Sequence, residues 1–552
     1  MHWNTEEAMP NSRSHTPVLI IGAGLAGCIA ALRLADQDVA VTLLCASDRF
    51  ENANSWLAQG GIIYRADEKK DAAALADDIL KAGHHINLPE AVTFLSVEGP
   101  KAVDELLIER VGVPFDRCSS GEAPEASDDT GLWDLTREGG HSACRIVHAA
   151  DHTGRTIMEY VMAAVRRSPL ITFKVGYTAI DLLTSHHHSK GMTYRYQLEN
   201  QCCGAYVLNE STGEVETMLA DVTVLATGGA GQVYLHTSNA VTATGSGIAM
   251  ASRAFVRLMN MEYMQFHPTT LFHIEPRRFL ITEALRGEGA RLFNADGEYF
   301  MEKRDPRGSL APRDVVSRAI VDEMLRSGQP CVFLDLGGVK QDLESRFPTV
   351  LQSCLERGID IRKQPIPVVP AAHYFCGGVL VDRKGRTSLE RLYAVGECSC
   401  TGVHGANRLA STSLLEALLW GKAAGDDIAR RVKRIYKGGC DDGFPTSTRL
   451  HEAIEDWVPL GEEHNDDPAL IAQDWAAVRN TMWNYVGITR TGPRLARAFE
   501  DMRDLSRRVH NFYKSTPLSR PIVDLFHGCQ AAYLITQAAL RNTNDIGCHH
   551  RV

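Results

Sequence analysis

The sequence lacks an apolar run long enough to cross a membrane. Its most apolar stretch, residues 18–32, is interrupted by glycines and is shorter than the roughly 20 residues that a spanning helix needs. The first fifteen residues are polar and lack the apolar centre of a secretory signal peptide. These absences argue against a membrane protein and predict a cytoplasmic location.

A surplus of positive charge is also missing. The 552 residues include 58 Lys and Arg against 68 Asp and Glu, a formal net charge of −10, which argues against general nucleic-acid binding. The 14 cysteines are scattered without the paired spacing of a zinc site, so we expect reduced thiols and no metal. With 44% hydrophobic residues, this length predicts a globular protein of about two to four domains.

A strand-like run that ends in a glycine motif is present near the N-terminus. Residues 18–21 lead into Gly22, Gly24 and Gly27 at G-x-G-x-x-G spacing, and a helical pattern follows. The first glycine permits a tight turn, the second lets the backbone approach a pyrophosphate, and the third lets the helix pack on the strand. The motif predicts dinucleotide binding; the alternative is ordinary glycine packing in an α/β core.

The expected second strand, residues 39–45, lacks the acid that usually holds a ribose at its end. Cys45, Ala46 and Ser47 occupy those positions, and Asp48 lies just beyond them. Another group must therefore hold the ribose. This absence weakens an NAD-dependent interpretation more than an FAD-dependent one.

Two further segments favour a large cofactor. Residues 222–229 (VTVLATGG) form a second apolar strand pattern that ends in glycines, and parallel strands deliver their ends to one edge of a sheet. Residues 54–62 (NSWLAQGGI) predict a loop of backbone donors for a flavin or a phosphate, although a plain turn is the alternative.

The order of these patterns predicts an α/β fold with a Rossmann-like FAD-binding domain made of residues 1–238 and 353–435. Residues 239–352 have mixed helix and strand patterns rich in Arg and Glu, and predict an inserted α+β capping domain. Residues 436–552 predict a C-terminal helical bundle, because apolar residues such as Leu495, Ala498 and Met502 recur at helical spacing. Six arginines are expected on its exposed side: Arg490, Arg494, Arg497, Arg503, Arg507 and Arg508.

Several long motifs, in order along the chain, carry a family resemblance. Besides the glycine-rich opening they are AQGG (58–61), LTREGGHS (135–142), ATGG (226–229), QFHPT (265–269), TEALRGEG (282–289), APRD (311–314), PAAHY (370–374) and HGANRLAS (404–411) with SLLE (413–416). From about residue 16 onward the chain resembles the L-aspartate oxidases, within the family of succinate dehydrogenase and fumarate reductase flavoproteins.

This resemblance implies a non-covalent FAD, because Asn54 stands where the dehydrogenases and reductases carry the histidine that bonds to the flavin. Three positions depart from the family near the cofactor: Ser47 replaces a usual Lys, Ser246 a usual Asp and Thr412 a usual Asn. The implied cofactor-binding residues are Gly22, Ala23, Gly24, Leu25, Ala26, Gly27, Ser47, Asn54, Ser55, Ala58, Gln59, Gly60, Gly61, Thr227, Gly228, Ser246, Glu397, Ser413 and Leu414.

The resemblance also implies a site for a C4 dicarboxylate. Arg408 would fork to one carboxylate, Glu138 would meet the amino group of aspartate, and Arg313 corresponds to the family's proton-transfer arginine. On composition alone, the charged loop around Glu138 is more typical of a solvated surface. The implied catalytic residues are Arg313, Glu138, His267, His373 and Arg408, and the implied substrate-binding residues are Gln265 and Thr282.

The implied reaction is oxidation of L-aspartate to iminoaspartate by FAD, the first step of NAD synthesis through quinolinate. Electrons then pass to oxygen, which gives hydrogen peroxide, or to fumarate, which gives succinate. Quinolinate synthase, the next enzyme of the pathway, is an implied functional partner. The alternatives are a soluble fumarate reductase or succinate dehydrogenase flavoprotein, and a flavin-binding protein without turnover.

Overall fold

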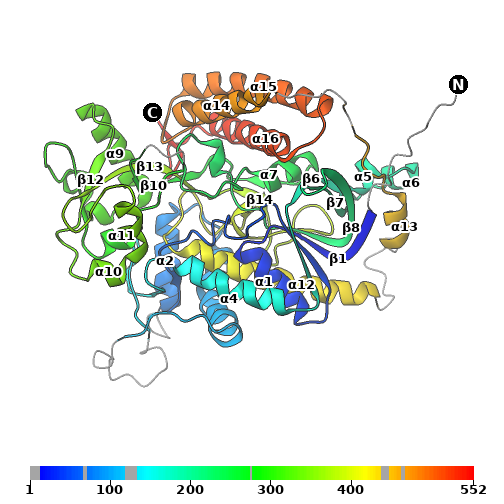
Figure 1. The fold of residues 1–552 in the computed structure, drawn as a ribbon, viewed down its shortest axis with the longest axis horizontal. Coiled ribbons are helices and arrows are strands. Elements are labelled where there is room, and N and C mark those ends of the chain that lie inside the picture. Colours follow the sequence, from blue (N-terminus) through cyan, green and yellow to red (C-terminus); the bar gives the residue numbers. More distant parts are fainter. Residues whose placement is uncertain are drawn as a thin grey trace.

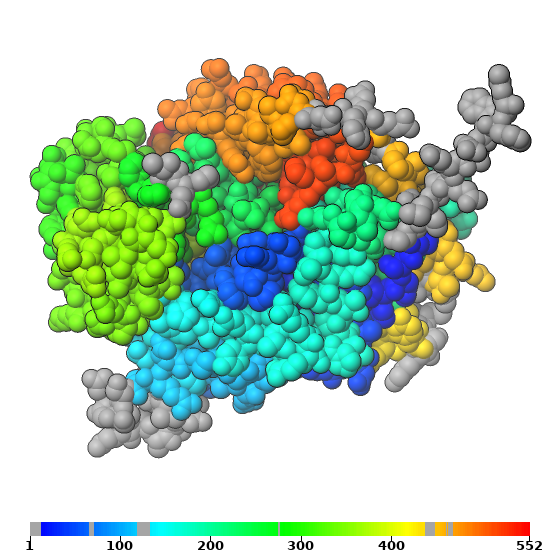
Figure 2. All heavy atoms as spheres, in the orientation of Figure 1, coloured from blue at the N-terminus to red at the C-terminus, as the bar shows by residue number. Residues whose placement is uncertain are grey.

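The computed structural model describes residues 13–65, 71–118, 133–273, 277–436, 447–459, 461 and 467–552. The prediction that the first fifteen residues form no signal peptide concerns residues that lie mostly outside this set. Figure 1 shows a central sheet above a layer of helices, a smaller sheet-containing unit at the left, and a layer of C-terminal helices on top. The space-filling view shows the smaller unit, in green, and the C-terminal helices, in orange to red, flanking the blue N-terminal segments (Figure 2).

The central sheet has seven strands within the described residues. Its order is β5 (Ile171–Val175), β2 (Val41–Cys45), β1 (Arg13–Ile21), β8 (Glu214–Leu225), β7 (Cys202–Asn209) and β6 (Tyr177–Thr184), and β15 (Leu392–Ala394) also pairs with β8. The pairs β5–β2, β2–β1, β1–β8 and β8–β15 are parallel, whereas β8–β7–β6 is antiparallel. Strands β1, β2 and β8 therefore end at one edge, as the glycine motifs predicted.

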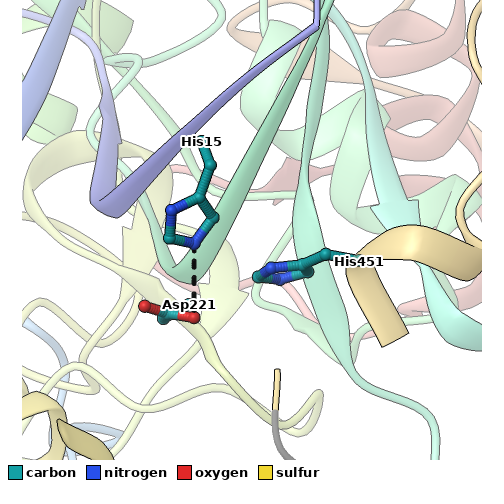
Figure 3. A group of neighbouring side chains, drawn as sticks. All are labelled: His15, Asp221 and His451. Atoms are coloured by element: carbon teal, nitrogen blue, oxygen red, sulfur yellow. Dashed lines mark ion pairs between the residues drawn. The ribbon is translucent and has the colours of Figure 1, made fainter. Parts of the chain in front are cut away.

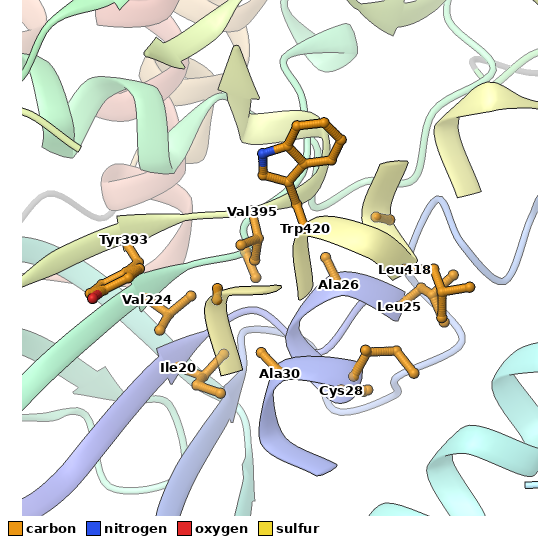
Figure 4. Close-up of a cluster of buried hydrophobic side chains, with 14 of the residues drawn as sticks. Ile20, Leu25, Ala26, Cys28, Ala30, Val224, Tyr393, Val395, Leu418 and Trp420 are labelled. Carbon is orange, nitrogen blue, oxygen red and sulfur yellow. The ribbon is translucent and has the colours of Figure 1, made fainter. Parts of the chain in front are cut away.

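A helical layer covers one face of this sheet. Helices α1 (Leu25–Ala35), α4 (Thr153–Arg167) and α12 (Thr412–Tyr436) form its centre, flanked by α2 (Asp71–Ala82), α3 (Pro89–Ala102) and a π-helix at Val103–Arg110. Figure 4 shows Ile20 and Val224 of the sheet on the side of Ala26 and Ala30 of α1, whereas the ring of Trp420 of α12 points away from them. The two helices approach closely because α12 carries Gly421, where a Cβ would lie 2.7 Å from the Ala26 carbonyl oxygen.

The smaller unit is built on an antiparallel sheet ordered β10 (Met264–Leu271), β13 (Ile366–Phe375), β12 (Val332–Asp335) and β11 (Arg291–Phe293). Helices α8 (Ala284–Gly287), α9 (Arg313–Ser327), α10 (Leu343–Arg346) and α11 (Pro348–Leu355) belong to this unit. Strand β13 pairs with β10 and β12, so residues 366–375 hydrogen-bond to strands of the range 239–352 rather than to the central sheet. A separate small sheet joins β9 (Leu258–Met259), β14 (Gly378–Leu380) and β16 (Ser399–Cys400).

The C-terminal layer consists of α14 (Pro468–Tyr485), α15 (Gly492–Ser515) and α16 (Arg520–Arg541), and α16 packs on α7 (Ser246–Arg253). Leu495, Ala498 and Met502 are buried, as the helical spacing predicted. The expected exposure of Arg490 is wrong: it lies in the short strand β17 (Thr489–Arg490), before α15 begins, and is fully buried. Its guanidinium donates to the carbonyl oxygens of Gly487 and Glu262.

Other short elements are β3 (Ile62–Ile63) with β4 (Ile146–Val147), α5 (Ser185–His188), α6 (Met192–Arg195), α13 (Ser447–Ala453), and β18 (His550–Arg551) beside β17. Among the helices in the described ranges, none is both long and apolar enough to pass through a bilayer.

Candidate active site

A long cavity runs along the edge at which β1, β2 and β8 end. Its lining includes Ile21, Cys45 and Ala226, which are the last residue of β1, the last residue of β2 and the residue after β8. In open α/β sheets, ligands bind outside the carboxyl ends of the parallel strands. The cavity continues between the central sheet and the smaller unit, since His267 of β10 and His373 of β13 line it as well.

The structure brings nearly all of the predicted site residues to this one cavity. Two of them do not line it: Gly27 and Gln265. Gly27 lies behind the turn, where a Cβ would meet the carbonyl oxygen of Gly22 at 2.0 Å, so its part is close packing of the helix. Gln265 is fully buried, and it holds other site residues as described below.

One end of the cavity fits a pyrophosphate. Gly22 has φ of +118°, and a Cβ there would lie 2.1 Å from the carbonyl oxygen of Ala226, so only glycine fits this turn. Helix α1 begins next to it without a side-chain cap, apart from Ser55 Oγ, which accepts from the Leu25 N–H at 3.1 Å. An open helix N-terminus offers N–H groups and a positive dipole to an anion.

The middle of the cavity carries polar groups suited to a heterocycle. Gln59 Oε1 is buried and has no hydrogen-bond partner among the described residues. Asn54 is fully engaged, because its Nδ2 donates to Glu397 Oε2 at 3.0 Å and its Oδ1 accepts from the Ala240 N–H at 2.8 Å. An amide held in this way offers no nucleophile to a flavin, and the residues present therefore fit a non-covalently bound FAD.

The other end of the cavity is cationic. Arg313 starts α9 and Arg408 lies in the loop before α12; both side chains are buried. The fully buried Gln265 connects them, since its Oε1 accepts from Arg313 Nη1 at 3.1 Å and from Arg408 Nη2 at 3.2 Å. Arg408 also donates to Ser413 Oγ at 2.8 Å and stacks over the ring of Tyr374. Burial, together with the charge of Arg313, lowers the pKa of Arg408 to about 10, so the guanidinium stays protonated at neutral pH.

Two histidines on neighbouring strands line the cationic end. The rings of His267 and His373 lie 4.9 Å apart, because β10 and β13 pair side by side. Burial and the charge of Arg313 hold the pKa of both imidazoles well below the usual range. Both rings are therefore neutral and act as hydrogen-bonding groups rather than as cations.

Two carboxylates accompany these cations. Glu138 accepts from Ser411 Oγ at 2.5 Å, and its pKa is raised by burial and by the negative charge of Glu283. Glu283 instead pairs with Arg313 at 2.5 Å and with Arg286 at 3.2 Å, and these arginines keep the pKa of its carboxyl low. The carboxylate of Glu283 is thus paired with arginines, whereas burial and the charge of Glu283 favour the protonated form of Glu138.

Sequence reasoning assigned no role to several residues of this site. Glu283 and Arg286 lie within the quoted TEALRGEG motif, so a charge pair at spacing i, i+3 was available as a signal. Ser411 closes the HGANRLAS motif and adopts φ of +57°. Arg520 and Asp524 also line the cavity, from the far C-terminal helix α16, and no local pattern marks them.

A separate group of His and Asp side chains lies at the start of the central sheet. Figure 3 shows His15 of β1 facing Asp221 of β8, with His451 of α13 beside them. His15 and Asp221 approach to 3.5 Å, and Tyr436 donates to the same carboxylate at 3.0 Å. His451 Nε2 hydrogen-bonds to the carbonyl oxygen of Ala220. These contacts connect β1, α12 and α13 to β8.

Comparisons with known proteins agree with this geometry. The family described as "FAD binding domain" matches residues 17–414. An "L-aspartate oxidase" of Pseudomonas aeruginosa is 42% identical over 97% of this chain and 94% of its own length, and one of Yersinia pestis is 42% identical over 98% and 97%. The solved structure of the E. coli quinol fumarate reductase subunit FrdA has a TM-score of 0.81 at 26% identity, covering 98% of this chain and 92% of that one.

The fold and the cavity define a flavoprotein of the FAD-binding-domain family, whose structural relatives include the flavoprotein subunits of fumarate reductase. Within that family the chain belongs to the L-aspartate oxidases. The predicted fold class and FAD as cofactor are thereby confirmed.

Proposed function

We propose that this protein oxidises L-aspartate to iminoaspartate, using FAD held in the cavity. The observation that carries the proposal is the cationic end of that cavity, where Arg313 and Arg408 are fixed on one amide oxygen. A dicarboxylate brings two negative charges, and burying them is favourable only where paired donors are already in place. The relatives named L-aspartate oxidase over nearly the whole chain support this substrate.

Different residues of the site would bind the two carboxylates and the amino group of aspartate. Arg408, whose guanidinium is held by Gln265 and Ser413, forks to one substrate carboxylate, while the neutral His267 and His373 with Thr282 hydrogen-bond to the other. Glu138 faces the amino group and accepts a hydrogen bond or a proton from it. FAD, when bound, takes the hydride from the substrate Cα. Orienting that Cα–H toward the cofactor is the main contribution of the protein.

Proton movement at the site would use Arg313 and Glu138. Arg313 is anchored by Glu283, which also contacts Arg286, so its guanidinium is fixed at the cationic end of the cavity, where it would donate a proton when fumarate is reduced. Glu138 has a raised pKa and can take a proton from the substrate ammonium before the hydride leaves. Positioned proton transfer of this kind contributes roughly 10²- to 10⁴-fold to a rate.

The electron acceptor and the cellular setting belong to the same proposal. Oxygen or fumarate would reoxidise the cofactor, and the product would pass to quinolinate synthase in the cytoplasm. Fumarate as acceptor is supported by the likeness to the fumarate reductase subunit. Because an imine hydrolyses in water, coupling to the enzyme that consumes it would limit the loss of product.

One anaerobic titration tests the function. We expect L-aspartate, added to the FAD-loaded protein without oxygen, to bleach the absorbance of the oxidised flavin, whereas D-aspartate does not. If aspartate does not reduce the flavin, but fumarate reoxidises a flavin that a reduced dye has reduced, the protein is a fumarate reductase instead. A flavin that responds to neither compound would identify a binding protein without turnover.

A further inference from the structure

The end of β2 holds no acid for the adenosine ribose, and the nearest polar side chain is already occupied. Ser47 Oγ accepts from Asn52 Nδ2 at 2.8 Å and from the Arg49 N–H at 3.2 Å, and donates to Asp48 at 3.1 Å. Asp48 is exposed and does not line the cavity. In dinucleotide-binding folds, a carboxylate at this strand end accepts hydrogen bonds from the ribose.

A carboxylate reaches the same place from the opposite end of the chain. Arg520 and Asp524, in the first turns of α16, line the cavity together with Ala46 and Ser47. Arg520 Nη1 donates to the carbonyl oxygen of Ala46 at 2.5 Å, and Arg520 Nε donates to Asp524 Oδ2 at 3.2 Å. The arginine therefore ties the acid to the residue that follows β2.

The Asp524 carboxylate retains acceptor capacity. Within the described part of the chain, Arg520 bonds only to its Oδ2, and Oδ1 has no hydrogen-bond partner. Arg520 is also within 3.4 Å of the carboxylate of Glu210, so its charge is shared between two acids. Burial raises the pKa of Asp524 to about 6, against the effect of Arg520, and the carboxylate is ionised at neutral pH.

We infer that Asp524 is the ribose-binding carboxylate of the cofactor site, supplied by the C-terminal helix α16 in place of an acid at the end of β2. Arg520 is a positioning residue, because it holds Asp524 against Ala46. The ligand is the adenosine ribose diol of FAD, so the inference rests on the proposed function for its cofactor. It adds a C-terminal element to a site whose recognised motifs end at residue 416.

The test measures the dissociation constant of FAD from the apoprotein by flavin fluorescence. We expect Asp524→Asn to weaken FAD binding by roughly 10- to 100-fold, the effect of losing a hydrogen bond to a charged acceptor. The matched control is Asp504→Asn, which removes an exposed acid of α15 and leaves FAD affinity unchanged. Equal affinities of wild type and Asp524→Asn would overturn the inference.

An FAD analogue that lacks both hydroxyl groups of the adenosine ribose distinguishes two roles of Asp524. The residue either binds the ribose or only holds α16 against the end of β2. Wild type should bind this analogue as weakly as Asp524→Asn binds FAD, and the substitution should add no further loss with the analogue. If Asp524→Asn weakens FAD and the analogue by the same factor, the acid is structural and the inference fails. Should the variant not fold, the wild-type protein decides alone: equal affinity for FAD and for the analogue overturns the assignment.

These measurements do not depend on turnover. A wild-type protein that is not bleached by aspartate would refute the proposed reaction, and the affinities would still decide the role of Asp524. Conversely, normal bleaching with an unchanged FAD affinity in Asp524→Asn would refute only the ribose assignment.

Discussion

Arg313 and Arg408 donate hydrogen bonds to the same oxygen atom, Oε1 of Gln265. Two like charges are thereby fixed close together in a buried site, and their repulsion contributes to the lowered pKa of Arg408. An anion between or above them would relieve that repulsion. The pair is thus prepared for a ligand with negative charge before any ligand arrives.

Replacing Arg408 should remove the binding of dicarboxylates. We expect Arg408→Leu to weaken competitive inhibition by succinate by at least about 100-fold, because a charge-assisted, forked pair is lost. Arg408→Lys keeps the charge but cannot fork, and should show an intermediate inhibition constant. The inhibition constant of succinate, measured on FAD-loaded protein, checks this; unchanged inhibition in Arg408→Leu would remove this residue from the substrate site.

Glu138 should matter more for aspartate than for fumarate. We expect Glu138→Gln to lower kcat/KM for L-aspartate by roughly 10- to 100-fold, since the amino group loses a charged acceptor. Fumarate carries no amine, so dye-linked fumarate reduction should change much less. Steady-state rates with both substrates check the difference, and equal losses would show that Glu138 does not recognise the amine.

The raised pKa of Glu138 predicts a specific dependence on pH. Burial and the negative charge of Glu283 raise the pKa of Glu138 above 4.5, the ordinary pKa of a glutamate. As the pH falls, Glu138 therefore becomes protonated earlier than an ordinary glutamate does. A protonated Glu138 no longer attracts the substrate ammonium, so kcat/KM for aspartate should decline on the acid side with an apparent pKa above 4.5. Glu138→Gln should abolish this acid limb, and a limb retained in the variant would assign it to another group.

Acid precipitation should release the flavin. Both ends of the Asn54 amide are hydrogen-bonded and neither is a nucleophile, so no covalent bond to FAD can form at this position. We expect the yellow colour in the supernatant after trichloroacetic acid treatment. Flavin that stays in the pellet would show a covalent link through another side chain.

His451 should make the protein less stable in acid. Burial lowers its pKa from 6.5 to about 4, so the folded state resists a proton that the unfolded chain binds readily. The stability from this group is fully present above pH 6.5 and is lost as the pH falls toward 4, by up to about 3 kcal/mol. The measurement is the midpoint of unfolding as a function of pH. His451→Gln should reduce the fall of this midpoint between pH 6.5 and 4, whereas His85→Asn, at an exposed histidine, should not. An unchanged slope in His451→Gln would contradict the assignment.

Sequence motifs correctly predicted the features that depend only on residues close together in the chain. The roles of Gly22 and Gly27 follow from steric limits on a strand–turn–helix unit, and the structure shows contacts of about 2 Å that any Cβ would make there. The helical spacing of Leu495, Ala498 and Met502 correctly indicated a buried face, because burial repeats with the turn of a helix.

Long-range pairing could not be predicted in the same way. The run at residues 366–375 has a strand pattern, but the pattern does not say which sheet it joins. Arg490 was expected on the solvent-exposed face of a helix, yet it precedes the helix and donates hydrogen bonds to buried carbonyl oxygens. The approach of Arg520 to Ala46 depends on how α16 docks, and no spacing in the sequence encodes it.

The cavity is closed by residues as far apart in the chain as Ile21 and Asp524. A nascent polypeptide emerging from the ribosome therefore lacks a complete pocket until its final long helix has been synthesised. Loading with flavin is therefore expected to follow translation rather than to accompany it. A chain that terminates before α16 would bind FAD weakly even when FAD is abundant.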